Sequence, residues 1–350
     1  MSRIVILTEG KSNPTDAKTA TGVLRYRADE VVAILDSGLT GTTAAERLGV
    51  GGDIPFIGSV ADVDADTLLI GIAPAGGGLP ASWRVLLRQA IERRMSIVSG
   101  LHVFIGDDPE FRELAEKRGV RIHDVRKPPA DLPVSRNVAR ETTCFRVHTV
   151  GHDCSVGKML TSLEITRVLQ ERGHSAEFLA TGQTGIMISG KGIPIDAVVG
   201  DFVSGAAEKL VLESRDRDFV VVEGQGSLIH PLFSGVTLGL LHGCAPQAMV
   251  MCVDPRRTGI KHGNAPMRPL PDVIDLYERM ANLIAPSSVV GVSLNTSSLS
   301  DSEAVAEVER LGGLTGLPTT DVIRFGCGPI VDAVLEARSA LSGSPGAVIS

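Results

Sequence analysis

The segment VGHDCSVGKML, residues 150–160, constrains the fold of this 350-residue chain more strongly than any other part of it. The apolar run CFRVHTV (144–150) predicts a buried strand, two glycines bracket a short turn after it, and Lys158 then opens a helical pattern. Such a turn directs several backbone N–H groups and the positive end of a helix dipole at one point, where a phosphate group fits. The segment therefore predicts a phosphate-binding loop in a parallel α/β domain. The alternative is a glycine-rich turn with a solvated lysine.

One part of the common phosphate-binding loop is missing. The residue after the lysine is normally Ser or Thr, whose hydroxyl holds Mg²⁺, but this chain has Met159. Thr161 lies about 200° around the helix and Ser162 lies a turn deeper, so neither should replace that hydroxyl. We therefore expect no metal, and a ligand such as coenzyme A, whose phosphates need charge stabilisation alone. The expected phosphate-binding residues are Gly151, Asp153, Cys154, Ser155, Val156, Gly157, Lys158 and Met159.

Apolar runs alternate with helical patterns along the whole chain, which is typical of parallel α/β folds. We predict a Rossmann-like N-terminal domain over residues 1–130 and a P-loop NTPase-like parallel-sheet domain over 131–350, because the proline-rich segment 125–133 interrupts the rhythm. The predicted strands are 3–8, 31–36, 67–73, 95–100 and 120–125, then 144–150, 176–180, 218–224, 247–253 and 289–295. The predicted helices are 79–94, 109–119, 158–173, 204–214, 271–284, 302–312 and 328–342.

Composition argues against several classes of function. A net charge of −7 and 3% aromatic residues argue against a nucleic-acid partner or an anionic membrane surface. The five cysteines include no C-x-x-C pair and are expected to be reduced thiols, without a disulfide or zinc site. The apolar stretch 236–253 contains His242 and Pro246, so it is a poor membrane span. We expect a soluble, cytoplasmic protein that binds a small molecule and forms a homo-oligomer.

The loop GHDCSVGKM resembles that of two kinds of protein. Dethiobiotin synthetase shares the longer G-x-D-x-x-V-G-K spacing but continues with threonine. The family of D-glutamate N-acetyltransferases, two-domain proteins formerly of unknown function, is more similar, because its loop also continues with methionine. That resemblance covers nearly the whole chain, in DAKTATGVLRY (16–26), GIAPAGGGLP (71–80), IPIDAVVGDFVSGAAE (193–208), VVEGQGSLIHP (221–231), MCVDPRRT (251–258) and SLNTSSLS (293–300).

The resemblance implies acetyl transfer from acetyl-CoA to the amino group of D-glutamate. The product, N-acetyl-D-glutamate, would pass to an epimerase-like partner enzyme in D-amino-acid catabolism. Two rivals remain: an ATP- and Mg²⁺-dependent ligase of the dethiobiotin-synthetase kind, and a non-catalytic nucleotide-binding protein.

Acetyl transfer to an amine needs a base that removes a proton from the substrate ammonium. Glu223 ends the apolar strand FVVVE, where a carboxylate faces the predicted loop; otherwise it caps a loop. Asp201 is either a base or the acidic entry to a helix. His152 and His230 flank the predicted pocket, as catalytic or as structural histidines. Cys154 allows an acetyl-cysteine intermediate, because a helix N-terminus lowers a thiol pKa; we favour direct transfer.

The expected substrate-binding residues are Thr181, Gln183, Thr184, Arg256 and Arg257. The first three belong to TGQTG (181–185), which either binds substrate or only turns the chain. The arginines can pair with substrate carboxylates, bind the 3′-phosphate of coenzyme A, or belong to a solvated loop.

The N-terminal half carries weaker signals. Asp36 ends a strand where Rossmann domains bind ribose, but no G-x-G-x-x-G follows the first strand, which argues against a nicotinamide dehydrogenase. APAGGGLP (73–80) is expected to be a tight turn, and Lys18 and Arg25 are candidate anion ligands.

Overall fold

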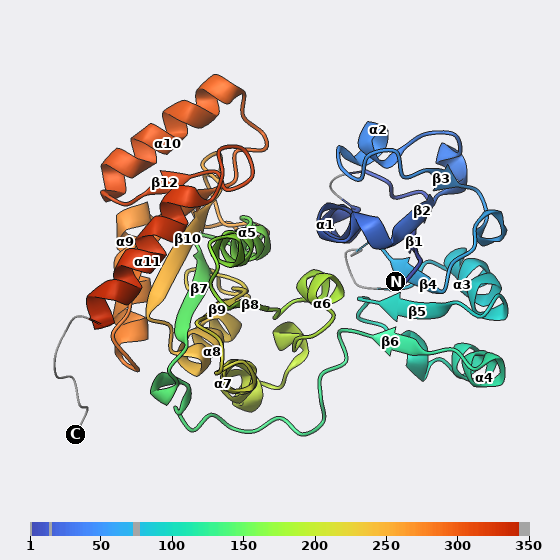
Figure 1. The fold of residues 1–350 in the computed structure, drawn as a ribbon, viewed down its shortest axis with the longest axis horizontal. Helices are drawn as coiled ribbons and strands as arrows, with labels where there is room; N and C mark the ends of the chain where they lie inside the picture. The colour runs from blue at the N-terminus through green and yellow to red at the C-terminus, as the bar shows by residue number, and fades with distance from the viewer. Residues whose placement is uncertain (1, 14–15, 73–77, 343–350) are drawn as a thin grey trace. The chain divides into compact units, whose positions relative to one another are not determined.

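The computed structural model describes residues 2–13, 16–72 and 78–342 of the chain, which forms two compact units (Figure 1). Unit 1 comprises Met1–Pro128 and Gln183–Pro194, and unit 2 comprises Pro129–Gly182 and Ile195–Ser350. The proline-rich segment 125–133 contains the first junction. Segment 183–194 belongs to unit 1 although it lies within the sequence of the second half.

Unit 1 is built on a parallel six-stranded sheet in the order β3-β2-β1-β4-β5-β6, so the predicted Rossmann-like architecture is confirmed. Five of the strands match predicted ones. The sixth, β3, has only two residues, too few for an apolar pattern to reveal. The strands are β1 (Ile4–Leu7), β2 (Val31–Leu35), β3 (Phe56–Ile57), β4 (Thr67–Ile70), β5 (Ser96–Ser99) and β6 (Ile122–Asp124).

The helices of unit 1 include one that comes from the second half of the sequence. Helix α6 belongs to unit 1, where the Thr184 hydroxyl lies 2.9 Å from that of Thr19 and Arg27 Nη1 donates to the Met187 carbonyl at 2.5 Å. In unit 2, Ile195 N donates to the Thr181 carbonyl at 2.9 Å, and this hydrogen bond joins the two ends of the chain that flank segment 183–194. The helices are α1 (Lys18–Tyr26), α2 (Ala44–Leu48), α3 (Trp83–Glu92), α4 (Pro109–Arg118) and α6 (Gln183–Ser189).

Unit 2 also has a parallel six-stranded sheet, in the order β12-β11-β10-β7-β9-β8, as a P-loop fold requires. Strands β10, β7, β9 and β8 can be followed in this order in Figure 1. The strands are β7 (Phe145–Gly151), β8 (Ala176–Leu179), β9 (Phe219–Val222), β10 (Ala248–Val253), β11 (Ser288–Leu294) and β12 (Thr319–Thr320).

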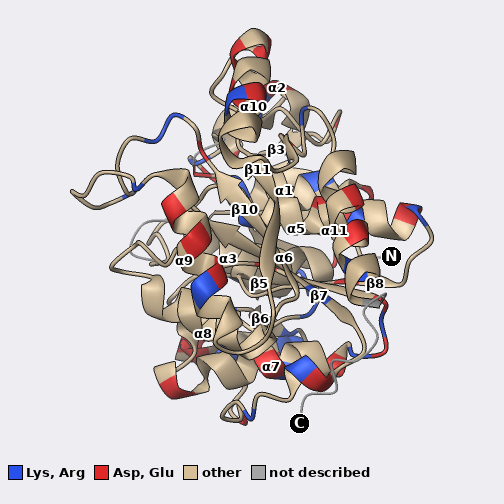
Figure 2. Ribbon diagram, turned by 90° about the vertical axis from the view of Figure 1, so that its left-hand side faces the viewer, with Lys and Arg blue, Asp and Glu red and all other residues tan. Residues whose placement is uncertain are grey.

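Helices cover the sheet of unit 2. They are α5 (Lys158–Glu171), α7 (Val203–Glu213), α8 (Ser234–Cys244), α9 (Leu270–Asn282), α10 (Asp301–Thr315) and α11 (Gly328–Ser342). Helix α8 was not predicted; it forms the first part of the apolar stretch 236–253, and strand β10 forms most of the rest. Figure 2 shows acidic and basic residues side by side on α7 and α10. Among the described residues, no helix is long and apolar enough to cross a membrane.

Strand β7 lies in the middle of the second sheet, and all seven of its residues are buried. Residues such as Val147 and Ile165 form an apolar cluster with α11, and Val150 belongs to another with α9. The chain leaves β7 at the carboxyl end, between β10 and β9. In open parallel sheets this switch point is where ligands bind.

Candidate functional site

The loop after β7 exposes a row of backbone donors. Ser155 has φ +55° and Gly157 has φ +102°, and these left-handed conformations turn the chain into α5. Within the described part of the chain, the N–H groups of residues 156–160 donate to no acceptor. They lie at the N-terminus of a 14-residue helix. An anion fits such an arrangement because the helix dipole and the free N–H groups act together.

Lys158 lies under this loop and is buried. Its Nζ donates to the Asp153 carbonyl at 2.9 Å, and desolvation lowers the pKa of the ammonium. Gly151 makes room for it, because a Cβ there would lie 2.6 Å from Nζ. The positive charge of Lys158 therefore lies close to the free N–H groups, ready to pair with phosphate.

Gly224 is equally constrained, and its replacement gives a first prediction. A Cβ at Gly224 would lie 1.8 Å from the Thr149 carbonyl oxygen and 2.9 Å from Lys158 Cδ. Gly224→Ala should therefore separate β9 from β7, lower stability by about 3 kcal/mol and reduce ligand binding, measured by thermal unfolding and calorimetry. Gly235→Ala is the matched control, because a Cβ at Gly235 meets nothing within 4 Å. Equal stability of the two variants would contradict the prediction.

The hydroxyls after Met159 point away from the loop, as predicted. The Thr161 hydroxyl lies 2.8 Å from that of Ser293 on β11. The Ser162 hydroxyl lies 2.8 Å from that of Thr149 on β7. Both therefore tie α5 to the sheet, and neither stands where a P-loop serine or threonine holds Mg²⁺.

Asp153 is fully buried and accepts three hydrogen bonds. They come from Arg257 Nη1 at 2.7 Å, Lys261 N at 2.8 Å and Cys154 N at 2.7 Å. Burial alone would raise the pKa of Asp153, but the hydrogen bonds, led by that of Arg257, hold it below its usual value. The carboxylate therefore stays ionised and fixes the shape of the loop.

The two arginines predicted to bind substrate have separate environments. Arg257 also donates to the Cys154 carbonyl at 2.6 Å, so its guanidinium supports the loop from within. Arg256 is exposed and pairs with Glu303 at 2.8 Å. Arg257 is therefore engaged within the loop, whereas Arg256 is accessible to a ligand.

The two predicted histidines also have different surroundings. His230 is fully buried; its Nε2 donates to the Lys261 carbonyl at 2.6 Å and its Nδ1 accepts from Leu232 N at 3.3 Å. Both nitrogens are occupied, so His230 is structural rather than a free base. His152 Nε2 donates to the Arg268 carbonyl at 2.7 Å, and desolvation lowers the pKa of the ring. His152 is thus held neutral beside the loop.

Cys154 is buried, and the structure corrects the expectation of a low thiol pKa there. Desolvation, reinforced by the neighbouring Asp153, raises the pKa of Cys154. The thiol also precedes the start of α5 by four positions. A neutral thiol is a poor nucleophile, and this favours direct transfer over an acetyl-cysteine intermediate.

The side chains of Asp153, Cys154 and His230 approach one another closely enough to hold a metal ion, with their ligand atoms within 4.8 Å. However, the hydrogen bonds described above already occupy Asp153 and His230, and the Arg257 guanidinium contacts the carboxylate. A cation would have to displace these groups. These three side chains are better explained as internal contacts that stabilise the loop.

Glu223 is the most perturbed carboxylate near the loop. It follows β9 directly, is 4% exposed, and its Oε2 accepts from Thr181 N at 2.9 Å and Gly182 N at 3.1 Å. Desolvation raises the pKa of Glu223 to about 7, although these two hydrogen bonds and Lys158 oppose the rise. Its other oxygen, Oε1, makes no hydrogen bond to any described residue. A base with a pKa near the working pH is well suited to accept and release a proton.

The other predicted site residues have different surroundings. Thr181 donates from both N and Oγ1 to Glu223, so it positions that residue instead of presenting a free hydroxyl. Gln183 and Thr184 belong to α6 in unit 1, where Thr184 pairs with Thr19. Asp201 is exposed in a short 3-10 helix before α7, which fits the helix-entry alternative.

Two further residues, Tyr277 and Lys261, contribute to the loop and were not predicted from the sequence. The Tyr277 hydroxyl donates to the Gly151 carbonyl at 3.0 Å and accepts from Leu228 N at 3.1 Å. Lys261 supplies the backbone N–H that contacts Asp153 and the carbonyl that contacts His230. No local pattern marks either residue, because each acts through a contact that is distant in sequence.

Among the described residues of unit 1, the candidate features form no comparable site. Asp36 accepts from Gly10 N at 3.1 Å, Ser12 Oγ at 2.5 Å and Gly38 N at 3.2 Å, and so fixes the turn after β1. Lys18 and Arg25 lie on α1. Residues 73–77 of the predicted turn APAGGGLP lie outside the described part of the chain.

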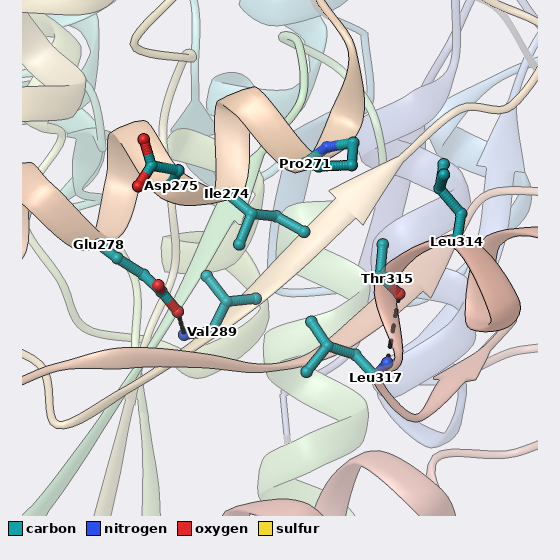
Figure 3. A pocket seen from close by; sticks show the side chains of 8 residues that line it. All are labelled: Pro271, Ile274, Asp275, Glu278, Val289, Leu314, Thr315 and Leu317. Atoms are coloured by element: carbon teal, nitrogen blue, oxygen red, sulfur yellow. Dashed lines mark hydrogen bonds between the residues drawn. The ribbon is translucent and has the colours of Figure 1, made fainter.

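A pocket of about 260 Å³ lies between α9, β11 and the end of α10 in unit 2 (Figure 3). Its two carboxylates are occupied: Glu278 accepts from Val289 N at 2.8 Å and Asp275 pairs with Arg279 at 2.8 Å. Val289 lies near the amino end of β11, at the sheet edge opposite the phosphate loop. This pocket is therefore separate from the candidate site.

Comparisons with known proteins match both halves of the chain. A family described as "Domain of unknown function (DUF1611_N) Rossmann-like domain" matches residues 37–128, and one described as "Domain of unknown function (DUF1611_C) P-loop domain" matches residues 133–331.

Two curated relatives are each named D-glutamate N-acetyltransferase. The protein from Tritonibacter scottomollicae is 38% identical over 334 residues, which cover 91% of this chain and 94% of the relative. The protein from a Pseudoalteromonas species is 39% identical over 319 residues, which cover 90% and 93%. A crystal structure of a DUF1611 family protein from Anabaena variabilis, 39% identical, aligns with a TM-score of 0.91 over 96% of this chain and all of that one.

Proposed function

We propose that this chain, which belongs to the DUF1611 family and is similar to two proteins named D-glutamate N-acetyltransferase, transfers an acetyl group from acetyl-CoA to the amino group of D-glutamate. The observation that carries this proposal is Glu223, a buried carboxylate with a pKa of about 7 and one oxygen that accepts no hydrogen bond from the described residues, near a loop suited to bind an anion. Acetyl transfer to an amine needs such a base and an anchor for the phosphates of coenzyme A.

The residues of the candidate site are suited to this reaction. The N–H groups of residues 156–160 and Lys158 would bind the pyrophosphate of acetyl-CoA, which donates the acetyl group from its thioester. The Glu223 carboxylate would take one proton from the substrate ammonium. The freed amine would bond to the thioester carbon, a second proton would leave the nitrogen, and the carbon–sulfur bond would break. The thiolate would take up a proton, leaving free coenzyme A and the amide.

Several wider expectations are part of the same proposal. The product, N-acetyl-D-glutamate, would pass to an epimerase-like enzyme that inverts its α-carbon. The enzyme would work in the cytoplasm as a homo-oligomer, without nucleic-acid or membrane partners. These statements rest on the resemblance and on composition.

A thiol-release assay tests the reaction. Purified protein, acetyl-CoA and D-glutamate are mixed with a chromogenic disulfide, and a blank without amino acid subtracts the protein's own cysteines. Parallel reactions contain L-glutamate, D-aspartate, or ATP with Mg²⁺. We expect thiol release that depends on D-glutamate and needs no ATP. ADP formation without thiol release would replace the proposal with the ligase, and no reaction under any condition would favour a binding protein.

A further inference from the structure

The strand order separates the surroundings of the phosphate loop into two sides. The loop follows β7, with β9 and β8 on one side and β10, β11 and β12 on the other. Glu223 and Thr181 follow β9 and β8, so the candidate base lies on the first side. Asn295 and Asp321 follow β11 and β12 on the second. All these strands are parallel, so their carboxyl ends lie at the same edge of the sheet.

Coenzyme A is an elongated ligand whose pyrophosphate separates an adenosine 3′-phosphate from the pantetheine arm. If the loop binds the pyrophosphate and the thioester reaches Glu223, the pantetheine arm extends over β9. An extended coenzyme A would then place its adenosine on the opposite side, over the ends of β10, β11 and β12. This direction follows from the strand order and from the position of Glu223.

The second side adjoins the loop. A Cβ placed on Gly157 would lie 3.9 Å from Asn295 Cβ, so the turn after β11 adjoins the last residue of the loop. Thr296, the next residue, donates from N and Oγ1 to Asp321 Oδ2 at 2.9 and 2.5 Å. The turns after β11 and β12 therefore form one surface that continues from the phosphate loop.

This surface presents an exposed aromatic side chain. Phe325 is 44% exposed, and most of the described aromatic side chains are partly or fully buried. Its turn is ordered by Asp321, whose carbonyl accepts from Phe325 N at 2.9 Å and whose Oδ1 accepts from Ile323 N and Arg324 N at 2.9 and 3.0 Å. A fixed, exposed ring offers an adenine base a stacking partner.

Arg324, the residue before Phe325, and Arg256 both pair with carboxylates of α10. Arg324 pairs with Asp301 at 2.8 Å, and Arg256 pairs with Glu303 at 2.8 Å, both on the first turn of α10. The side chains of Arg256 and Glu303 are both more than half exposed, so a phosphate can compete for this guanidinium at little cost. Arg256 is thus available to a 3′-phosphate.

We propose that Phe325, in the turn after β12, binds the adenine of coenzyme A, with Arg256 at its 3′-phosphate. This subsite would anchor the cosubstrate at the end remote from the reaction. The inference rests on the proposed function, because it takes coenzyme A as the ligand and Glu223 as the reacting end.

Calorimetric titration of the full-length protein with coenzyme A, dephospho-coenzyme A and phosphopantetheine tests this subsite. Phe325→Ala should weaken coenzyme A binding about 10-fold, since the adenine base loses the aromatic ring on which it would stack. It should leave phosphopantetheine binding unchanged, and Phe325→Trp should restore affinity. Arg256→Gln should weaken binding of coenzyme A but not of dephospho-coenzyme A.

Phe233→Ala is the matched control, because Phe233 is 38% exposed and follows β9 on the other side of the loop. Equal loss of coenzyme A and phosphopantetheine affinity in Phe325→Ala would overturn the inference, as would an adenosine-specific loss in Phe233→Ala instead. If the unaltered protein does not bind coenzyme A, the proposed function itself is refuted. If the unaltered protein binds coenzyme A and Phe325→Ala binds it equally well, only the adenine subsite is refuted.

Discussion

Replacing Glu223 with glutamine should lower the turnover number by about 10²- to 10⁴-fold, the usual contribution of a positioned general base. The glutamine can keep the hydrogen bonds from Thr181 N and Gly182 N, because its Oε1 can accept both. Binding of acetyl-CoA should therefore remain nearly unchanged. Steady-state kinetics and calorimetric titration separate the two effects.

The pKa of Glu223 predicts how the rate and the stability depend on pH. A base with a pKa of about 7 must be ionised to act, so the rate should rise as the pH rises through 7. Folding raises this pKa from 4.5, so the protonated form favours the folded state. That stability is present below pH 4.5 and is lost as the pH rises to about 7, by roughly 3 kcal/mol in total. Glu223→Gln should therefore be more stable than the unaltered protein at pH 8.

Glu208 provides a matched control, since it is also a buried glutamate of unit 2. Its oxygens accept from Arg136 N at 2.8 Å and Val138 N at 2.7 Å, so it holds the segment before β7. Glu208→Gln should lose stability and keep its turnover per folded molecule. Full activity in Glu223→Gln, or equal loss in both variants, would remove Glu223 from its proposed role.

Arg257→Gln should lower the midpoint of thermal unfolding by roughly 6–12 °C. Asp153 is fully buried and Arg257 is 16% exposed, and removing one partner of a buried pair costs about 3–5 kcal/mol. We take the lower end because Arg257 keeps some contact with water, and about 3 kcal/mol corresponds to this shift in a unit of some 200 residues. The unpaired carboxylate under the loop should also weaken coenzyme A binding.

The adjacent Arg256→Gln is the control for this effect. Arg256 pairs only with Glu303 among the described residues through its side chain, and the pair is exposed. Its loss should barely change the unfolding midpoint, measured by calorimetry in the same buffer. If both variants unfold at the same temperature, the buried pair with Asp153 does not support the loop as described.

The sequence was sufficient to predict the features that depend on local patterns. The phosphate loop is a continuous segment between a strand and a helix, and Glu223 directly follows an apolar run. Most strands of both sheets are short apolar runs between turns, and most of these were predicted within one or two residues; the two-residue strands β3 and β12 were not predicted. The direction of Thr161 and Ser162 followed from helix geometry alone.

The roles of individual side chains depended on distant partners and could not be predicted in this way. Arg257 contacts Asp153 across 104 positions, and Tyr277 contacts Gly151 across 126. Nothing near Arg257 in the sequence distinguishes it from Arg256. His230 was predicted to be either catalytic or structural, and only the structure shows that both its nitrogens are occupied. Burial, which decides the pKa of Cys154, is likewise a property of the whole fold.

Because α6 belongs to unit 1, only certain recombination points between this protein and its relatives keep each unit intact. A recombinant that joins residues 1–128 of one protein to the remainder of another receives α6 from the wrong parent, with Thr184 facing a foreign Thr19 position and the Met187 carbonyl a foreign Arg27 position. Faithful exchange needs three crossovers, after residues 128, 182 and 194. We therefore expect substitutions in segment 183–194 to correlate with substitutions in the first 128 residues. The two halves of the sequence should then evolve together and not as independent modules.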